Sequence, residues 1–255
     1  MQMYVAKNAQ EMGKVAAGKI ADKLKSAIKL RGEARLLLST GASQFETLEA
    51  LCNEDLKWNK VTAFHLDEYL GIDADHPASF RKYLYERFAS KVPVREMVYV
   101  NTTGNVEDNI QNLTQRVREK PIDVGVIGIG ENAHIAFNDP PANLESKEAY
   151  HIVQLNDTCR KQQVGEGWFK QVQDVPQYAV SMTPYQIMLC QSIVSPVPGA
   201  RKAKAIAAML NAHETDAMIP ATLLKTHHDF MKIRPRKMSW NSNKTTILDR
   251  RKGSG

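Results

Sequence analysis

Hydrophobic positions recur along the chain with two different spacings. Between residues 5 and 30 the apolar side chains fall three and four positions apart with lysines between them, which predicts an amphipathic helix. Similar patterns predict helices over about residues 44–51, 79–88, 106–117 and 201–210. Short runs that are almost entirely apolar separate these helices and predict buried strands at residues 35–39, 61–66, 97–100, 122–129, 178–182 and 192–194.

This alternation of strands and helices is typical of an α/β fold, with a parallel sheet and helices on both faces. No internal repeat or convincing linker divides the chain, so we predict a single domain over residues 1–230. The pattern stops after about Phe230. Residues 231–255 are predicted to form a basic, flexible C-terminal tail in which only residues 245–248 could make a strand.

Composition and charge limit the classes of protein to which this chain can belong. Hydrophobic residues make up 43% and charged residues 24%, which is ordinary for a globular protein. The net charge is +6, but residues 231–255 contain eight Lys or Arg and one Asp, so the body of the chain is near neutral. This argues against a nucleic-acid groove across the body.

The cysteines and the hydropathy pattern give an expectation for the cellular compartment of the protein. Three cysteines lie far apart and none has the spacing of a zinc ligand, which predicts reduced thiols and a cytoplasmic protein. No apolar run approaches the ~18 residues of a membrane span. The N-terminus has no signal-peptide pattern, so we expect neither secretion nor a membrane partner.

Candidate chemistry gathers where predicted strands end, which is where open parallel sheets bind ligands. Residues 39–44 turn into a helix through small and hydroxyl residues, a pattern that suits an anion or merely caps the turn. Asp67 closes the strand over residues 61–66. A carboxylate at the rim of an apolar sheet is poorly solvated and therefore more basic, although a solvated strand end explains it equally well. His65 and Asp67 are predicted to share one face of that strand.

A third segment, residues 128–140, combines a glycine-rich turn with His134 and, five residues later, Asp139. A histidine that follows such a turn, with a carboxylate close enough to orient it, favours a catalytic role. A fourth turn at residues 199–202 offers Lys202 as a point charge for phosphate, or simply a solvated helix start.

Together these segments resemble the glucosamine-6-phosphate deaminase (isomerase) family, which is related to the 6-phosphogluconolactonases. The resemblance runs from about residue 5 to residue 228. It is carried most specifically by Asp-Glu-Tyr at 67–69 and His-Ile-Ala-Phe-Asn at 134–138. It implies a modified Rossmann-like sheet and conversion of glucosamine 6-phosphate to fructose 6-phosphate and ammonia. It also implies a small sugar phosphate as partner, a homo-oligomer, and no metal or other cofactor.

The resemblance assigns roles residue by residue. Asp67 matches the carboxylate that moves a proton between C2 and C1, and His134 matches the imidazole that opens the sugar ring, with Asn132 and Asp139 at the positions that flank it in the family's catalytic group. The matches to phosphate-binding positions are Thr40, Gly41, Ala42, Ser43 and Lys202, with Arg160 as a candidate arginine. Glu68 and Tyr69 match supporting positions.

Three positions depart from the family pattern: Asn132 stands where Asp is common, Ala133 where Gly is common, and Asp139 where Glu is common. Asn132 can orient an imidazole but cannot stabilise its charged form as a carboxylate would. Ala133 fits without strain only if its φ angle is negative.

Alternative functions stay open at this point. The chain could be a related sugar-phosphate isomerase or a lactonase, or a sugar-phosphate sensor that has lost catalysis. The basic tail could also carry a nucleic-acid or membrane contact of its own.

Overall fold

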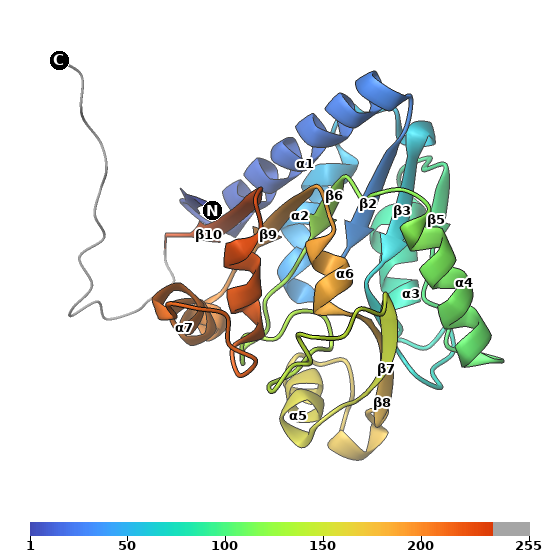
Figure 1. The fold of residues 1–255 in the computed structure, drawn as a ribbon, viewed down its shortest axis with the longest axis vertical. Helices are drawn as coiled ribbons and strands as arrows, with labels where there is room; N and C mark the ends of the chain where they lie inside the picture. Colours follow the sequence, from blue (N-terminus) through green and yellow to red (C-terminus); the bar gives the residue numbers. More distant parts are fainter. Residues whose placement is uncertain (237–255) are drawn as a thin grey trace.

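A seven-stranded parallel sheet forms the centre of the computed structural model, which describes residues 1–236 (Figure 1). The strand order is β1-β10-β9-β6-β2-β3-β5, and every neighbouring pair runs parallel. The strands are β1 (Gln2–Ala6), β2 (Ala34–Leu38), β3 (Val61–His65), β5 (Glu96–Val98), β6 (Val124–Val126), β9 (Ser192–Pro196) and β10 (Phe230–Pro235). The prediction of a Rossmann-like α/β domain is confirmed.

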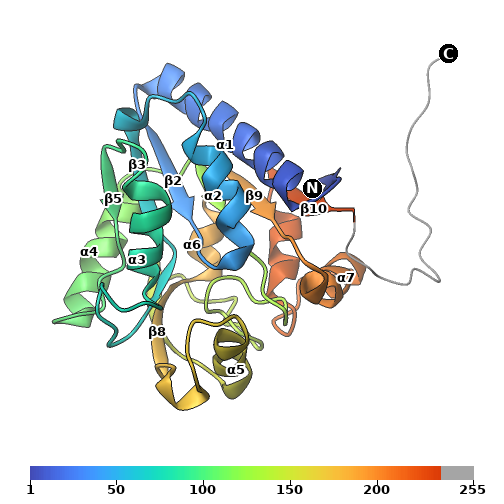
Figure 2. The ribbon, with the colours of Figure 1, turned by 180° about the vertical axis from the view of Figure 1, so that it is seen from behind.

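Helices cover both faces of this sheet, as the sequence predicts. Side chains of α1 (Ala9–Arg31), α2 (Phe45–Cys52) and α3 (Phe80–Leu84, continued by a π-helical turn at Tyr85–Ala89) share one apolar cluster with one face of the sheet (Figure 2). The cluster on the other face includes α4 (Val106–Arg118), α6 (Pro184–Met188) and α7 (Ala203–Asn211) (Figure 1). None of the helices within residues 1–236 combines the length and apolarity needed to cross a membrane.

A second, smaller sheet lies beside the carboxyl ends of the main strands. It is antiparallel, in the order β4 (Asp67–Tyr69), β8 (Tyr178–Met182) and β7 (Tyr150–Gln154), with α5 (Asp157–Gly165) next to it (Figure 1). The prediction that residues 178–182 join the parallel sheet is therefore wrong. Leu66 links the two sheets, because its N–H donates to Leu38 of β2 and its carbonyl accepts from Met182 of β8.

The strands β1 and β10 show that the predicted domain boundary at residue 230 is misplaced. β1 was not predicted, and β10 lies between β1 and β9, so residues 231–235 belong to the sheet and not to a tail. The sequence pattern hid this strand because Lys232 and Arg234 interrupt its apolar side chains. Lys232 is nevertheless fully buried. The rest of the predicted tail, including the strand expected at residues 245–248, lies outside the described residues.

Candidate active site

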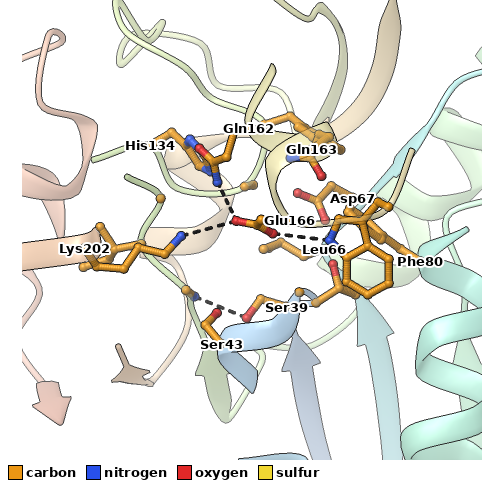
Figure 3. A pocket seen from close by; sticks show the side chains of 18 residues that line it. Ser39, Ser43, Leu66, Asp67, Phe80, His134, Gln162, Gln163, Glu166 and Lys202 are labelled. Atoms are coloured by element: carbon orange, nitrogen blue, oxygen red, sulfur yellow. Dashed lines mark hydrogen bonds and ion pairs between the residues drawn. The ribbon is translucent and has the colours of Figure 1, made fainter. Parts of the chain in front are cut away.

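A cavity opens where β2, β3 and β6 end (Figure 3). It encloses about 560 Å³ of space when the open mouth is included. Three of the sequence segments singled out above meet there, since Thr40 follows β2, Asp67 follows β3 and Gly130 follows β6. The lining residues include Ser39, Thr40, Gly41, Ser43, Asp67, Phe80, Gly128, Gly130, His134, Phe137, Gln162, Gln163, Glu166, Trp168 and Lys202.

Asp67 presents a carboxyl group to this cavity from the first position of β4. The residue is 5% exposed, and within residues 1–236 no hydrogen bond or ion pair to another residue engages its carboxyl group. Burial, reinforced by the neighbouring Glu68 carboxylate, raises the pKa of Asp67 to about 8. The basic carboxylate expected at the sheet rim is thus present, and it can exchange a proton near neutral pH.

Glu68 points away from the cavity and ties β4 to α3. Its fully buried carboxylate accepts hydrogen bonds from the hydroxyl of Ser79 at 2.9 Å and from the N–H of Arg81 at 2.8 Å. The next residue, Tyr69, donates its hydroxyl to Oε1 of Gln163 at 2.6 Å. Both side chains therefore hold neighbouring elements against the strand that carries Asp67.

His134 faces the cavity from the loop after β6. Its Nδ1 lies 2.6 Å from Oδ1 of Asn132 and 3.2 Å from Oδ1 of Asp139, while Nδ2 of Asn132 donates to the same Asp139 oxygen at 2.9 Å. Because both neighbours of Nδ1 are acceptors, Nδ1 carries a proton and Nε2 is left for the cavity. Burial opposes ionisation of Asp139, but the hydrogen bonds with His134 and Asn132 outweigh it and lower the Asp139 pKa.

The loop before His134 is shaped around the imidazole. A Cβ atom at Gly130 would lie 2.1 Å from the ring, so only glycine fits there. Ala133 has a φ angle of +69°, in the left-handed region. The condition for an unstrained alanine at this position is therefore not met, and the loop stores strain next to His134.

The predicted phosphate-binding residues are brought together, with two exceptions. Thr40, Gly41, Ser43 and Lys202 line the cavity, and Gly41 uses a φ angle of +94° to turn the chain towards α2. Ala42 belongs to the same turn but does not line the cavity.

Arg160 is the second exception, and its expected place in the cavity is wrong. Its guanidinium donates to the carbonyl of Val172 at 2.7 Å and lies 3.6 Å from Asp157, over a separate hollow. The orientation of α5 explains this, because it turns Gln162 and Gln163 towards the cavity instead.

His65 also differs from the prediction. It ends β3, whereas Asp67 begins a strand of the other sheet, so the two do not share a strand face. His65 is fully buried and its Nδ1 accepts from the N–H of Val100. Burial, with a smaller contribution from Arg81, lowers its pKa to about 3, so the ring stays neutral.

Sequence reasoning missed the contribution of α5 and the residues that follow it. Gln162, Gln163, Glu166 and Trp168 all line the cavity, and Oε1 of Glu166 lies 3.7 Å from Nζ of Lys202. No local pattern marks them, because α5 reaches the cavity only through the position of the small sheet. The described residues contain no cluster of three His, Cys, Asp or Glu side chains able to hold a metal ion.

Comparison with known proteins agrees with this geometry. The sequence profile of glucosamine-6-phosphate isomerases/6-phosphogluconolactonase matches residues 7–233. A glucosamine-6-phosphate deaminase from Streptococcus pneumoniae serotype 4 is 31% identical over 230 residues, covering 90% of this chain and 94% of that protein.

Solved structures give the same picture of the fold. A monomeric glucosamine-6-phosphate deaminase superposes with a TM-score of 0.84 at 27% identity, covering 93% of this chain and 98% of its own. A 6-phosphogluconolactonase from Thermotoga maritima superposes with a TM-score of 0.76 at 15% identity, covering 92% of this chain and 99% of its own, which speaks for the fold alone. With its fold, its cavity and the profile match over most of its length, this chain belongs to the family of glucosamine-6-phosphate isomerases and 6-phosphogluconolactonases.

Proposed function

We propose that this protein is a glucosamine-6-phosphate deaminase that produces fructose 6-phosphate and ammonia. The observation that carries the proposal is the buried Asp67 carboxyl group, which has no hydrogen-bond or ion-pair partner within residues 1–236 and lies in the same cavity as His134 (Figure 3). Lys202 and the turn at Thr40–Ser43 provide the anion-binding end of that cavity. Binding the phosphate there would place the sugar between the two titratable side chains.

In the proposed reaction, His134 acts in ring opening and Asp67 acts in the proton transfer that follows. His134 takes the proton of the C1 hydroxyl through Nε2 and returns it to the ring oxygen, which opens the ring. Asp67 then removes the C2 proton and delivers it to C1, and a proton lost from the amino nitrogen is taken up by the C1 oxygen. The aldehyde carbon is thereby reduced to a hydroxymethyl group while C2 is oxidised to an imine. Water adds to C2 and ammonia leaves. The reaction needs no external oxidant, and a single carboxylate that reaches both carbons suffices.

The alternative is hydrolysis of a sugar-phosphate lactone, as named for the structural relatives at 15–19% identity. The deaminase reaction is favoured by the 31% identity to a curated deaminase, and by a carboxyl group whose raised pKa suits reversible proton transfer. A sensor that has lost catalysis is less favoured, because Asp139 places a carboxylate beside His134 despite the change at Asn132.

The test is to supply glucosamine 6-phosphate, galactosamine 6-phosphate and 6-phosphogluconolactone separately, and to follow ammonia, ketose phosphate and free acid. We expect ammonia and fructose 6-phosphate in equal amounts from the first substrate. Acceleration of lactone hydrolysis alone would refute the deaminase proposal. Binding of all the ligands without any product would establish a sensor instead.

The homo-oligomer and the cytoplasmic location implied at the sequence level stay predictions. One structural relative is described as monomeric, so the assembly state needs its own measurement. Sedimentation equilibrium would give the number of subunits directly.

A further inference from the structure

Glu166 brings a second carboxyl group into the cavity that contains Asp67. Its Oε1 accepts from Nε2 of Gln162 at 2.9 Å, and its Oε2 accepts from the indole N–H of Trp168 at 3.3 Å. Both donors come from its own segment of the chain, so the carboxylate is held in place independently of Lys202. Because a carboxylate offers about four lone-pair sites, these two bonds leave it able to accept more.

The charges that line the cavity do not suit a ligand that is only an anion. Lys202 is the only Lys or Arg among the cavity-lining residues of the described chain, and its Nζ lies 3.7 Å from Oε1 of Glu166. The lysine charge is therefore partly offset where a phosphate would bind. Only 14% of the Glu166 side chain is exposed, so water compensates this carboxylate poorly. A ligand that also carries a positive charge would compensate it.

Glu166 lies between the two ends of the cavity. Figure 3 shows its carboxylate between Lys202 on one side and Asp67 on the other. A sugar phosphate with its phosphate on Lys202 and its C2 atom at Asp67 therefore extends past Glu166. In a hexosamine phosphate the amino group is attached to C2. At neutral pH this group is an ammonium ion, which can donate a charge-assisted hydrogen bond to a carboxylate.

We propose that Glu166 binds the 2-ammonium group of the substrate and makes the cavity selective for amino-sugar phosphates over sugar phosphates with a hydroxyl group at C2. The inference rests on the proposed function, because it takes Lys202 to hold the phosphate and Asp67 to act at C2. It adds a specificity-determining residue that contacts the nitrogen and moves no proton. A hydroxyl group at C2 leaves the carboxylate uncompensated beside the phosphate, so the penalty falls on the wrong ligand.

Two open-chain ligands that differ only at C2 test the proposal: 2-amino-2-deoxyglucitol 6-phosphate and glucitol 6-phosphate. Neither contains an aldehyde, so neither is turned over, and calorimetric titration at pH 7 gives a dissociation constant for each. The wild-type protein should bind the amino ligand about tenfold or more tightly, because a hydrogen bond between charged groups contributes more than one to a hydroxyl group. Glu166→Gln should bring the ratio of the two dissociation constants close to one.

This ratio separates recognition of the amino group from a purely structural role of Glu166. If Glu166 only pairs with Lys202, Glu166→Gln changes the affinity for both ligands by the same factor and leaves the ratio unchanged, which would overturn the inference. Equal binding of the two ligands by the wild-type protein would overturn it as well. The expected result is a loss of affinity for the amino ligand, with the affinity for glucitol 6-phosphate retained or increased.

Glu131→Gln is the matched control, since Glu131 pairs with Arg201 at 3.4 Å and does not line the cavity. This variant loses the same charge and should keep the wild-type ratio. Thermal unfolding verifies that each variant is folded, and Glu166→Ala takes the place of Glu166→Gln should that protein not fold.

Turnover of glucosamine 6-phosphate by the wild-type protein is measured on the same preparation, so that the two proposals are tested separately. A preference for the amino ligand that depends on Glu166, without turnover, would support the role of Glu166 and refute the deaminase. Turnover without that preference would support the deaminase and overturn the role of Glu166.

Discussion

Nδ1 of His134 lies 3.2 Å from Oδ1 of Asp139, and Asn132 contacts both side chains. Asn132 fixes the orientation of the imidazole, and Asp139 supplies the negative charge that an asparagine lacks. The shorter carboxylate side chain at position 139 therefore still reaches the ring. The group proposed to open the sugar ring thus keeps a carboxylate beside its imidazole, even though two of its positions depart from the family pattern.

These different roles predict that substitutions at Asn132 and Asp139 have unequal effects on kcat. Asp139→Asn should lower kcat by about 10²–10⁴-fold, because an imidazolium formed during ring opening would lose the carboxylate that lies beside it. Asn132→Asp, which restores the common family residue, should leave kcat near or above the wild-type value. Steady-state kinetics would decide, and an Asp139→Asn enzyme within threefold of wild type would show that the charge is not used.

The raised pKa of Asp67 predicts the direction of the pH dependence. Asp67 must be ionised to take the C2 proton, and its pKa of about 8 leaves most of it protonated at pH 7. At saturating substrate, kcat should rise with pH and level off above about pH 8. A profile that is flat between pH 5 and pH 9 would mean that another group accepts the proton.

The left-handed backbone at Ala133 predicts a stabilising substitution. Ala133→Gly should raise the free energy of unfolding by about 1 kcal/mol, because glycine adopts a positive φ angle without the Cβ clash. Ala149→Gly is the control: Ala149 is buried but does not have a positive φ angle, so this change should destabilise the protein. Urea denaturation measures both. A destabilised Ala133→Gly protein would show that this strain is absent in solution.

The burial of Lys232 predicts that the free energy of unfolding depends on pH. Burial, with a smaller effect of Arg234, lowers its pKa to about 7, and within the described residues its ammonium group has no hydrogen-bond partner. Below pH 7 the folded state carries the full cost of a buried charge. Between pH 7 and 10.5 only the unfolded state binds the proton, so the cost decreases as pH rises.

Lys232→Met should therefore stabilise the protein at pH 6, by on the order of 2 kcal/mol, and the gain should shrink towards pH 10. Lys14→Met, on the exposed side of α1, should show no such trend. Chemical denaturation across this pH range gives the answer, and a pH-independent effect of Lys232→Met would mean that Lys232 titrates normally in the folded protein.

Particular residues show how much of the fold and of the site could be predicted from the sequence. The strand ends carrying Thr40, Asp67 and His134 were identifiable because apolar runs stop there and polar residues begin. β10 was missed because a buried lysine looks like a tail residue, and only the packing of neighbouring strands buries it. Arg160 was misplaced and Glu166 was overlooked for the same reason. The orientation of α5 depends on the small antiparallel sheet, and no local sequence pattern predicts that sheet.

The most direct test of the central claim is to follow the proton that Asp67 is proposed to move. Glucosamine 6-phosphate is converted in D₂O, and the fructose 6-phosphate formed is analysed by NMR. We predict at most one deuterium at C1, always in the same of its two prochiral positions, and loss of turnover in Asp67→Asn. Deuterium in both positions, or an Asp67→Asn enzyme that still turns over at the wild-type rate, would contradict the account.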